Sequence, residues 1–191
     1  MSIKRYSATK DNTISSAFKV NLSDKALTSN MGSSDILEVF SIFGQASSSS
    51  LEQSRILVSF EIDKIHSDRQ AGIIPASGSA KFKLKMFNAE HNQTVPERIT
   101  LTAIPLVKEW SEGSGLDMES YLDVGPSSWN SASTGVAWTN TGGDFLSSSY
   151  IATSPVPLNY TQFLESGLES VEIDATDIVE QMLINEAGNS T

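Results

Sequence analysis

The chain of 191 residues contains no cysteine, few basic residues and no long apolar run. Without cysteine, disulfide bridges, thiolate metal ligands and a cysteine nucleophile are excluded. Lys and Arg number 13 against 23 Asp and Glu, which gives a net charge of −10. Because phosphate binding relies on clustered cations, this balance argues against nucleic acid as a partner. We expect the acidity to serve mainly solubility.

Two further absences concern membranes and export. No apolar run approaches the roughly 20 residues that span a bilayer, so we expect no membrane insertion. The N-terminal segment carries basic residues but no apolar region behind them, so it is not a secretory signal. These patterns predict synthesis in a cytoplasm and, if the protein reaches the outside, release by another route such as cell lysis.

The segment from Trp110 to Phe145 is the most unusual part of the sequence. It holds all three tryptophans (Trp110, Trp129 and Trp138), is rich in Gly, Ser, Asn and Asp, and lacks Lys and Arg. Such a composition does not form long regular elements. A solvated linker would not carry three tryptophans, because each buries a large apolar area when it packs. The segment is therefore predicted to be a long ordered loop that folds back over a β-sheet core.

Alternating apolar and polar residues predict strands over 36–43, 55–62, 81–86, 99–107, 148–153 and 171–173. Residues 1–18 also look extended, with a turn at Asp11 and Asn12. The segment 36–43 is apolar on both faces, which predicts a central position in a sandwich. Residues 88–98 and 160–168 are predicted to be a polar hairpin loop and a polar connection.

Helical signals are few. Asp174 is a good N-cap, and Asp177 favours the first turn of the helix that follows. Residues 63–70 are predicted to form a short helical turn with Ile65 facing inward. Many short strands, turn signals between them and one convincing C-terminal helix indicate an all-β sandwich.

Candidate chemical groups are scattered. His66 and His91 stand in separate polar segments without a second ligand at metal spacing, so we expect surface histidines. Four carboxylates of the tryptophan-rich segment are expected to accept hydrogen bonds within loops; they are Asp117, Glu119, Asp123 and Asp144. A calcium ion held by Asp117, Asp123 or Asp144 is the alternative.

The roles of two groups of side chains stay open, those of the loop aromatics and those of a row of lysines. Trp129 and Trp138 either pin the long loop onto the sheet or stack on sugar rings of a glycan, and Tyr121 and Tyr150 carry the same ambiguity. A row of lysines at 81, 83 and 85 either faces solvent at a protected sheet edge or meets an acidic partner.

The order of six features resembles that of the DNRLRE domain, a jelly-roll family related to carbohydrate-binding modules. The features are Asn30-Met31-Gly32 before Ile36-Leu37-Glu38-Val39; the strand Arg55 to Glu61; Ile74-Pro75 before Ser79 to Leu84; Val107 to Glu112; Trp129, Trp138 and Gly142-Gly143-Asp144; and Val171 to Val179. The resemblance covers nearly the whole chain. It implies a jelly-roll β-sandwich, with residues 1–18 as an extended first strand and residues 19–191 as the jelly-roll domain.

The variant of the pattern around Gly115-Leu116-Asp117-Met118 and Ser127-Ser128-Trp129-Asn130 resembles virion structural proteins of tailed phages, the marine cyanobacterial phages among them. This implies a non-enzymatic structural or interaction protein located in the virion. Other virion proteins and further copies in a symmetric homo-oligomer are the implied partners. The alternative is a carbohydrate-binding module that contacts a cell-surface glycan during host attachment.

The family pattern also implies two closing strands after the C-terminal helix, whereas this sequence ends at Gly188 to Thr191. Two explanations are open: the sequence is part of a longer protein, which we favour, or a neighbouring chain supplies the missing strand.

Overall fold

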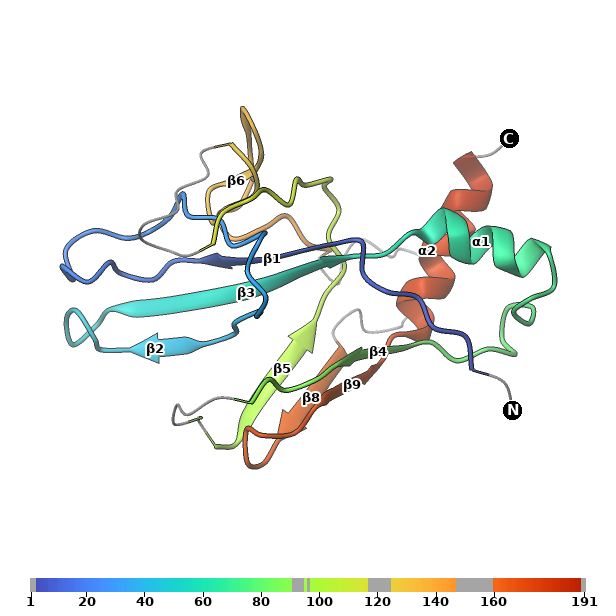
Figure 1. Ribbon diagram of the computed structural model, residues 1–191, viewed down its shortest axis with the longest axis horizontal. Coiled ribbons are helices and arrows are strands. Elements are labelled where there is room, and N and C mark those ends of the chain that lie inside the picture. Colours follow the sequence, from blue (N-terminus) through green and yellow to red (C-terminus); the bar gives the residue numbers. More distant parts are fainter. Residues whose placement is uncertain (1–2, 91–94, 96, 117–124, 147–159, 190–191) are drawn as a thin grey trace. The chain divides into compact units, whose positions relative to one another are not determined.

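The computed structural model describes residues 3–90, 95, 97–116, 125–146 and 160–189. This part contains nine strands and two helices, which confirms the expectation of a mainly β protein (Figure 1). Neither helix combines the length and the apolar character needed to cross a bilayer. The chain divides into two compact units that alternate along the sequence. Unit 1 comprises Met1–Arg5, Glu61–Pro105 and Leu146–Thr191, and unit 2 comprises Tyr6–Phe60 and Leu106–Phe145.

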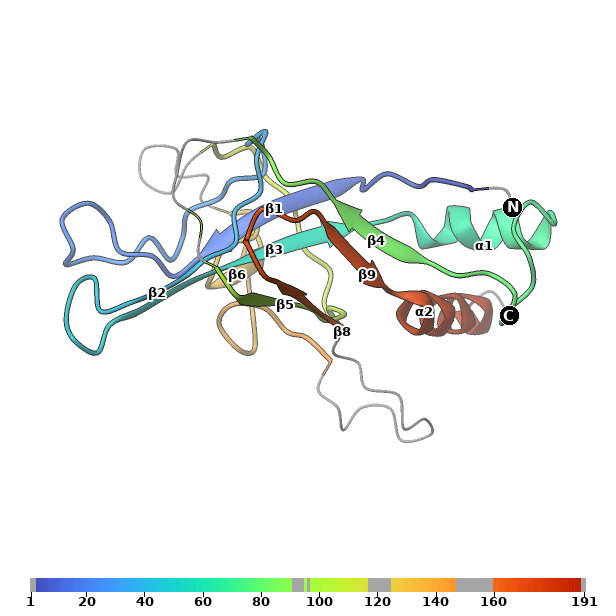
Figure 2. The ribbon, with the colours of Figure 1, turned by 90° about the horizontal axis from the view of Figure 1, so that it is seen from below.

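Unit 2 is built on a three-stranded antiparallel sheet. β3 (Leu51–Ser59) lies between β1 (Lys10–Ser15) and β2 (Ser41–Phe43), and the three strands run side by side in Figures 1 and 2. The tryptophan-rich segment adds a small hairpin of β6 (Ser131–Ser133) and β7 (Val136–Ala137). Ile14 and Leu57 project from the sheet into the core of this unit, where they meet the three tryptophans.

Unit 1 contains two strand pairs and two helices. β4 (Lys83–Met86) pairs with β9 (Val171–Asp174), and β5 (Ile99–Ala103) pairs with β8 (Tyr160–Leu164). The register places Leu84 opposite Ile173 on one face of the first pair. Because side chains alternate between faces, Lys83 and Lys85 lie on the other face, where both form ion pairs with Glu172. This arrangement fits the solvated-face interpretation of the lysines.

The two helices of unit 1 are α1 (Ile62–Gln70) and α2 (Thr176–Asn189). Ile65 of α1 is buried, as predicted, and so is Leu183 of α2. The predicted N-cap, Asp174, ends β9 instead, and Ala175 stands at the cap position, where its carbonyl accepts the first helical hydrogen bond, from the Val179 N–H. The carboxylate of Asp174 accepts a hydrogen bond from the Thr176 N–H at 3.0 Å and so supports the first turn from one residue earlier.

A bidentate ion pair joins the two helices. Arg69 of α1 donates two hydrogen bonds of 2.7 Å to Glu180 of α2, and both side chains are less than a fifth exposed. The hydrogen bonds from Arg69 are the main cause that lowers the pKa of Glu180 below its ordinary value. Two-point guanidinium–carboxylate pairing fixes the relative orientation of the two groups, so this pair sets how α1 and α2 pack.

Three secondary-structure predictions were wrong. The segment 36–43 is not a central strand, because only Ser41–Phe43 forms a strand and it lies at the edge of its sheet. Its preceding residues bond to hydroxyl groups instead: Glu38 N–H donates to Thr13 and Phe40 N–H donates to Ser54. Residues 160–164, predicted to be a connection, form β8, and Ile62 begins α1 instead of ending a strand.

The predicted turn at Asp11 and Asn12 was also wrong, since both residues lie within β1. Asn12 is fully buried and its side chain bonds to a distant loop, a use of asparagine that the local sequence does not reveal. The predicted strand 148–153 lies outside the described residues.

We predict that Glu180→Gln lowers the free energy of unfolding by roughly 2 kcal/mol at pH 7, because Arg69 stays mostly buried without its counter-charge. The folded-state pKa of Glu180 is below the ordinary 4.5. Its contribution is therefore complete above that value and lost as the pH falls through the folded-state pKa. Urea unfolding at pH 7 and pH 3 should show a difference between variant and wild type that shrinks in acid.

The matched control is Glu61→Gln, since Glu61 precedes α1, is exposed and makes no side-chain capping bond. It should change stability by less than about 0.5 kcal/mol. Equal losses in the two variants would contradict the role given to the Arg69–Glu180 pair.

Candidate functional site

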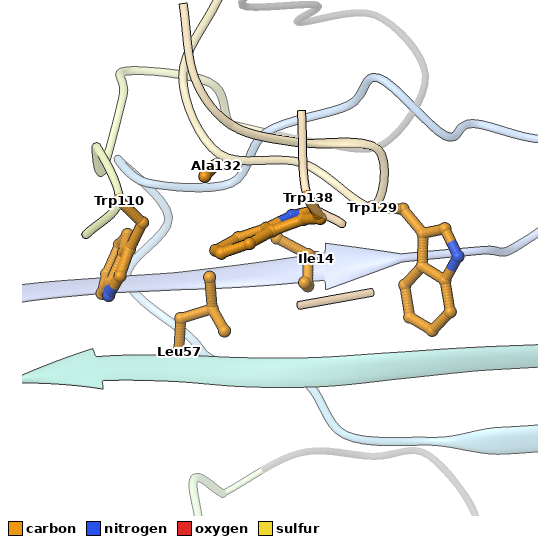
Figure 3. Close-up of a cluster of buried hydrophobic side chains, with 6 residues drawn as sticks. All are labelled: Ile14, Leu57, Trp110, Trp129, Ala132 and Trp138. Atoms are coloured by element: carbon orange, nitrogen blue, oxygen red, sulfur yellow. The ribbon is translucent and has the colours of Figure 1, made fainter. Parts of the chain in front are cut away.

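The described parts of the tryptophan-rich segment, residues 110–116 and 125–145, cover one face of the unit 2 sheet. Figure 3 shows the three indole rings lying between the loop and strands β1 and β3, with Trp138 over Ile14. Trp110, Trp129 and Trp138 are 7%, 9% and 5% exposed. The interpretation of Trp129 and Trp138 as anchors of the loop therefore agrees with the structure. Neither ring offers a solvent-facing surface on which a sugar would stack.

Polar groups on and around the two rings are also occupied. The indole N–H of Trp138 donates to the carbonyl of Ser128 at 2.8 Å. The guanidinium of Arg55 lies 5.0 Å from the centre of the Trp129 ring and 5.0 Å from that of Phe145. Burial lowers the pKa of Arg55, whose side chain also donates to the carbonyl of Gly142. Arg55 is thereby used to hold the loop by cation–π stacking and a hydrogen bond.

Asn30 pairs four main-chain groups around its buried side chain. Its amide nitrogen donates to the carbonyls of Glu112, at 2.6 Å, and Ser127, at 2.9 Å. Its amide oxygen accepts hydrogen bonds from the N–H groups of Gly32 and Gly115. Asn30 is fully buried. A single side chain thus supplies the partners that a strand ladder would otherwise give to this part of the loop.

Asn12, which lies in β1, also pairs loop groups with its buried side chain. Its amide nitrogen donates to both the carbonyl and the hydroxyl of Ser127, and its oxygen accepts from the N–H of Met31. The two asparagines therefore converge on Ser127 from β1 and from the 30–32 loop. Asn12, Asn30 and Ser127, which we call the asparagine junction, join three stretches of chain that are far apart in sequence.

Glycine makes the asparagine junction sterically possible. A Cβ atom on Gly115 would lie 2.0 Å from the main-chain oxygen of Asn30, and one on Gly32 would lie 2.3 Å from that of Glu112. Contacts of that length do not occur between real atoms, so any larger residue would force the loop away. The close approach of main chains therefore requires glycine at positions 32 and 115.

Asp144 fastens the other end of the loop. Its carboxylate accepts hydrogen bonds from the N–H groups of Thr139 and Asn140 at 2.9 and 2.8 Å and pairs with Lys108 at 3.2 Å. These contacts, led by the Thr139 N–H, hold the pKa of Asp144 well below its usual range. The role predicted for this carboxylate as a loop acceptor is confirmed.

The remaining candidates are dispersed or lie outside the described residues. The latter are Asp117, Glu119, Tyr121, Asp123, Tyr150 and His91, so a calcium site involving Asp117 or Asp123 stays a prediction. His66 lies half-buried on α1. Within the described ranges, no three His, Asp or Glu side chains are grouped closely enough to hold a metal ion.

A surface hollow of about 440 Å³ lies at one end of unit 2, between the 17–26 loop and Gln45. Its lining is mostly apolar and consists of Ala17, Phe18, Lys19, Val20, Leu22, Ala26 and Gln45. One ammonium group and one amide do not form an acid–base pair or a nucleophile with its base. The hollow therefore offers mainly apolar contacts and two polar groups, those of Lys19 and Gln45.

Glu52 is a buried carboxylate that the sequence did not single out. It is 2% exposed, and one oxygen accepts a hydrogen bond from the Phe18 N–H at 2.7 Å. The other oxygen is buried without a hydrogen-bond partner in the described part of the chain. The predicted strand began at Arg55, so Glu52 lay outside it. Alternation also shows only which face a residue occupies and not what covers that face.

Comparison of the chain with protein-family models, with curated proteins and with solved structures gives no match.

We predict that Asn30→Ala lowers the free energy of unfolding by at least about 3 kcal/mol, because four buried main-chain groups lose their partner. Asn140→Ala is the matched control: Asn140 belongs to the same unit, but its side chain is exposed. Chemical denaturation followed by tryptophan fluorescence measures both. Wild-type stability of Asn30→Ala would show that the asparagine junction does not hold the loop.

A second prediction concerns Trp138. Its replacement by Ala should cost roughly 3–5 kcal/mol, because a large aromatic side chain leaves a cavity in the core. Val136→Ala removes a side chain that is 43% exposed on the same hairpin and should cost much less. A Trp138→Ala protein that unfolds like wild type but loses a measured glycan affinity would restore the sugar-stacking interpretation.

Proposed function

We propose that this chain is a non-enzymatic structural protein that acts by binding other proteins, as a component of a tailed phage particle. The observation that carries the proposal is that the polar and aromatic side chains of unit 2 are occupied by contacts within that unit. Asn12, Asn30, Arg55, Asp144 and Trp138 would be the natural material of a reactive or sugar-binding site, and each is occupied by contacts within unit 2.

The surface supports binding to protein. Several large apolar side chains stand in solvent on ordered backbone: Val20 is 83% exposed, Phe43 72%, Phe87 84% and Phe163 51%. Aromatic and aliphatic groups of this kind are what protein interfaces bury. The exposed apolar side chains could be buried against another protein. The polar groups of unit 2 are already engaged within the chain, which supports the proposal that the chain acts by binding proteins.

The jelly-roll sandwich is proposed as the finer fold class. The chain begins in unit 1, passes to unit 2, returns to unit 1, enters unit 2 a second time and ends in unit 1. The strand partners are correspondingly distant in sequence, as in β4 with β9 and β5 with β8. Strand order of this crossed kind is characteristic of Greek-key and jelly-roll proteins, and it supports the proposal.

The place in a virion rests on the resemblance of the segments around Gly115 and Trp129 to phage structural proteins. Other virion proteins and further copies of this chain, in a symmetric homo-oligomer, are the proposed partners. The carbohydrate-binding alternative rested on the resemblance and on aromatic loop residues, of which Trp129 and Trp138 are buried, while Tyr121 and Tyr150 lie outside the described residues.

The particle role is tested by mass spectrometry of gradient-purified phage particles from the source that encodes the sequence. We expect the chain in a fixed ratio to the other structural proteins, retained after a high-salt wash. Detection only in the soluble fraction of the lysate would contradict the proposal. A glycan array probed with the purified chain should show no binding, and a specific glycan hit would favour the alternative.

A further inference from the structure

Two loops meet at one end of unit 2 and expose apolar side chains there. The first is the hairpin 18–25, which a β-bridge between Phe18 and Lys25 closes, and the second is the connection 44–50 between β2 and β3. Figures 1 and 2 show the two loops side by side. Lys25 joins them, since its ammonium group donates to the carbonyl of Leu51 at 3.0 Å. We call this part of the surface the apolar end, and its exposed apolar side chains are Val20, Leu22, Phe43 and Leu51.

Leu22 adopts an unfavourable main-chain conformation. Its φ is 54°, in the left-handed region where the Cβ of a residue other than glycine crowds the main chain. Asparagine occupies this region more readily than leucine. The leucine side chain is 42% exposed, so burial within the fold offsets only part of the strain. Strain at an exposed apolar residue points to a contact outside the fold.

Side-chain hydrogen bonds hold both loops in shape. The amide oxygen of Asn21 accepts the N–H groups of Ser23 and Asp24, at 2.9 and 3.1 Å, and so fixes the hairpin turn. In the second loop, the hydroxyl of Ser50 accepts two N–H groups of the same loop, at 3.0 and 3.1 Å. Because the loops are ordered without a partner, little conformational entropy is lost when their apolar side chains are buried on binding.

The apolar end carries little net charge. The connection 44–50 has no charged residue, and the hairpin has Lys19, Lys25 and Asp24. Neither lysine forms an ion pair with a carboxylate of the described ranges. Glu52 lies beneath the hairpin, where it is 2% exposed. This end is therefore close to neutral, in a chain whose net charge is −10.

The openness and composition of the apolar end indicate what it binds. Its hollow of about 440 Å³ leaves Val20 83% exposed, so it does not enclose a small soluble ligand, whose site would cover most of the ligand surface. Protein interfaces are poor in lysine and serine. The apolar end has two lysines and four consecutive serines at 47–50, and it has no arginine, tyrosine or tryptophan. An extended apolar layer bordered by phosphate groups matches these side chains better than another protein does.

We propose that the apolar end docks on the surface of a zwitterionic phospholipid bilayer. Val20, Leu22 and Phe43 enter the boundary between headgroups and acyl chains, where they are stabilised by leaving water. Lys19 places its ammonium group at the level of the lipid phosphates and its stem along the apolar layer. A surface without net charge does not repel a chain of charge −10, whereas an anionic surface does. Docking of this kind needs no helix that crosses the bilayer.

This inference goes beyond the proposed binding to proteins, and it is tested with the purified chain and without any particle. Co-sedimentation should show binding to vesicles of phosphatidylcholine and phosphatidylethanolamine. Vesicles that also contain phosphatidylglycerol should bind more weakly at low salt, and added salt should remove the difference by screening the repulsion. Stronger binding to the anionic vesicles would contradict the choice of a zwitterionic surface. No binding to any vesicle would overturn the proposal and leave the apolar end for a protein partner.

Leu22→Asn separates docking from folding. Because asparagine tolerates the left-handed region, the variant should unfold at the wild-type temperature or above it. The loss of an inserted leucine should weaken vesicle binding by roughly fivefold. Unchanged vesicle binding would overturn the proposal, whatever the unfolding temperature.

Charged variants test the other inserted side chains. Val20→Asp and Phe43→Asp each place a carboxylate in the apolar layer and should weaken vesicle binding by roughly tenfold or more. The matched control is Phe87→Asp, which changes an 84% exposed phenylalanine of unit 1 and should leave binding at the wild-type level. Equal weakening in all three variants would show unspecific adhesion and would overturn the proposal.

A fluorescent label tests which end faces the lipid. Because the chain has no native cysteine, Val20→Cys introduces a single thiol that takes a polarity-sensitive fluorophore. Vesicles should shift the emission of this label to the blue and leave the same label at Phe87→Cys unchanged. Equal shifts at the two positions would rule out docking through the apolar end.

Discussion

The fold of unit 2 depends on pairing the main-chain groups of a long loop that lies on a sheet without joining it. A buried N–H or carbonyl group without a partner costs about 1–3 kcal/mol, so a covering loop of this length is stable only if its groups are satisfied. Asn12 and Asn30 meet this requirement, because each is fully buried and each reaches Ser127. The glycines at 32 and 115 allow the main chains to approach closely enough for these bonds.

The asparagine junction holds the loop on the sheet, and the aromatic and charged side chains of the loop then make structural contacts. The indole rings fill the space between loop and sheet (Figure 3), and Asp144 binds two N–H groups at the far end. A carboxylate with its oxygens so engaged is a poor proton acceptor, as its lowered pKa also indicates. The interior chemistry of the unit therefore serves structure, which directs the search for function to its surface and edges.

Charged and uncharged strands both lie at the edges of the described sheets. Unit 1 displays the lysine-bearing strand β4, whose charges pair with Glu172, together with the uncharged strands β5 and β8, and unit 2 displays the uncharged strand β2. Phenylalanines and aliphatic residues are exposed on both units, among them Phe43 and Phe163, and this exposure supports the proposed binding to other proteins.

The sequence alone determined the class of structure and several local elements. Alternation located most of β3, β4, β5 and β9, the capping pattern located α2, and the three tryptophans marked the loop that covers a core. Only the tertiary structure decided which strands pair, that β2 is an edge, that 160–164 is a strand and that Asn12 lies within one. Alternation shows which side chains share a face, but strand partners such as β4 and β9 are chosen by contacts between residues far apart in the chain. Asn12 has the same local signature as a turn asparagine, because the groups its side chain pairs with lie 115 residues away at Ser127 and 19 residues away at Met31.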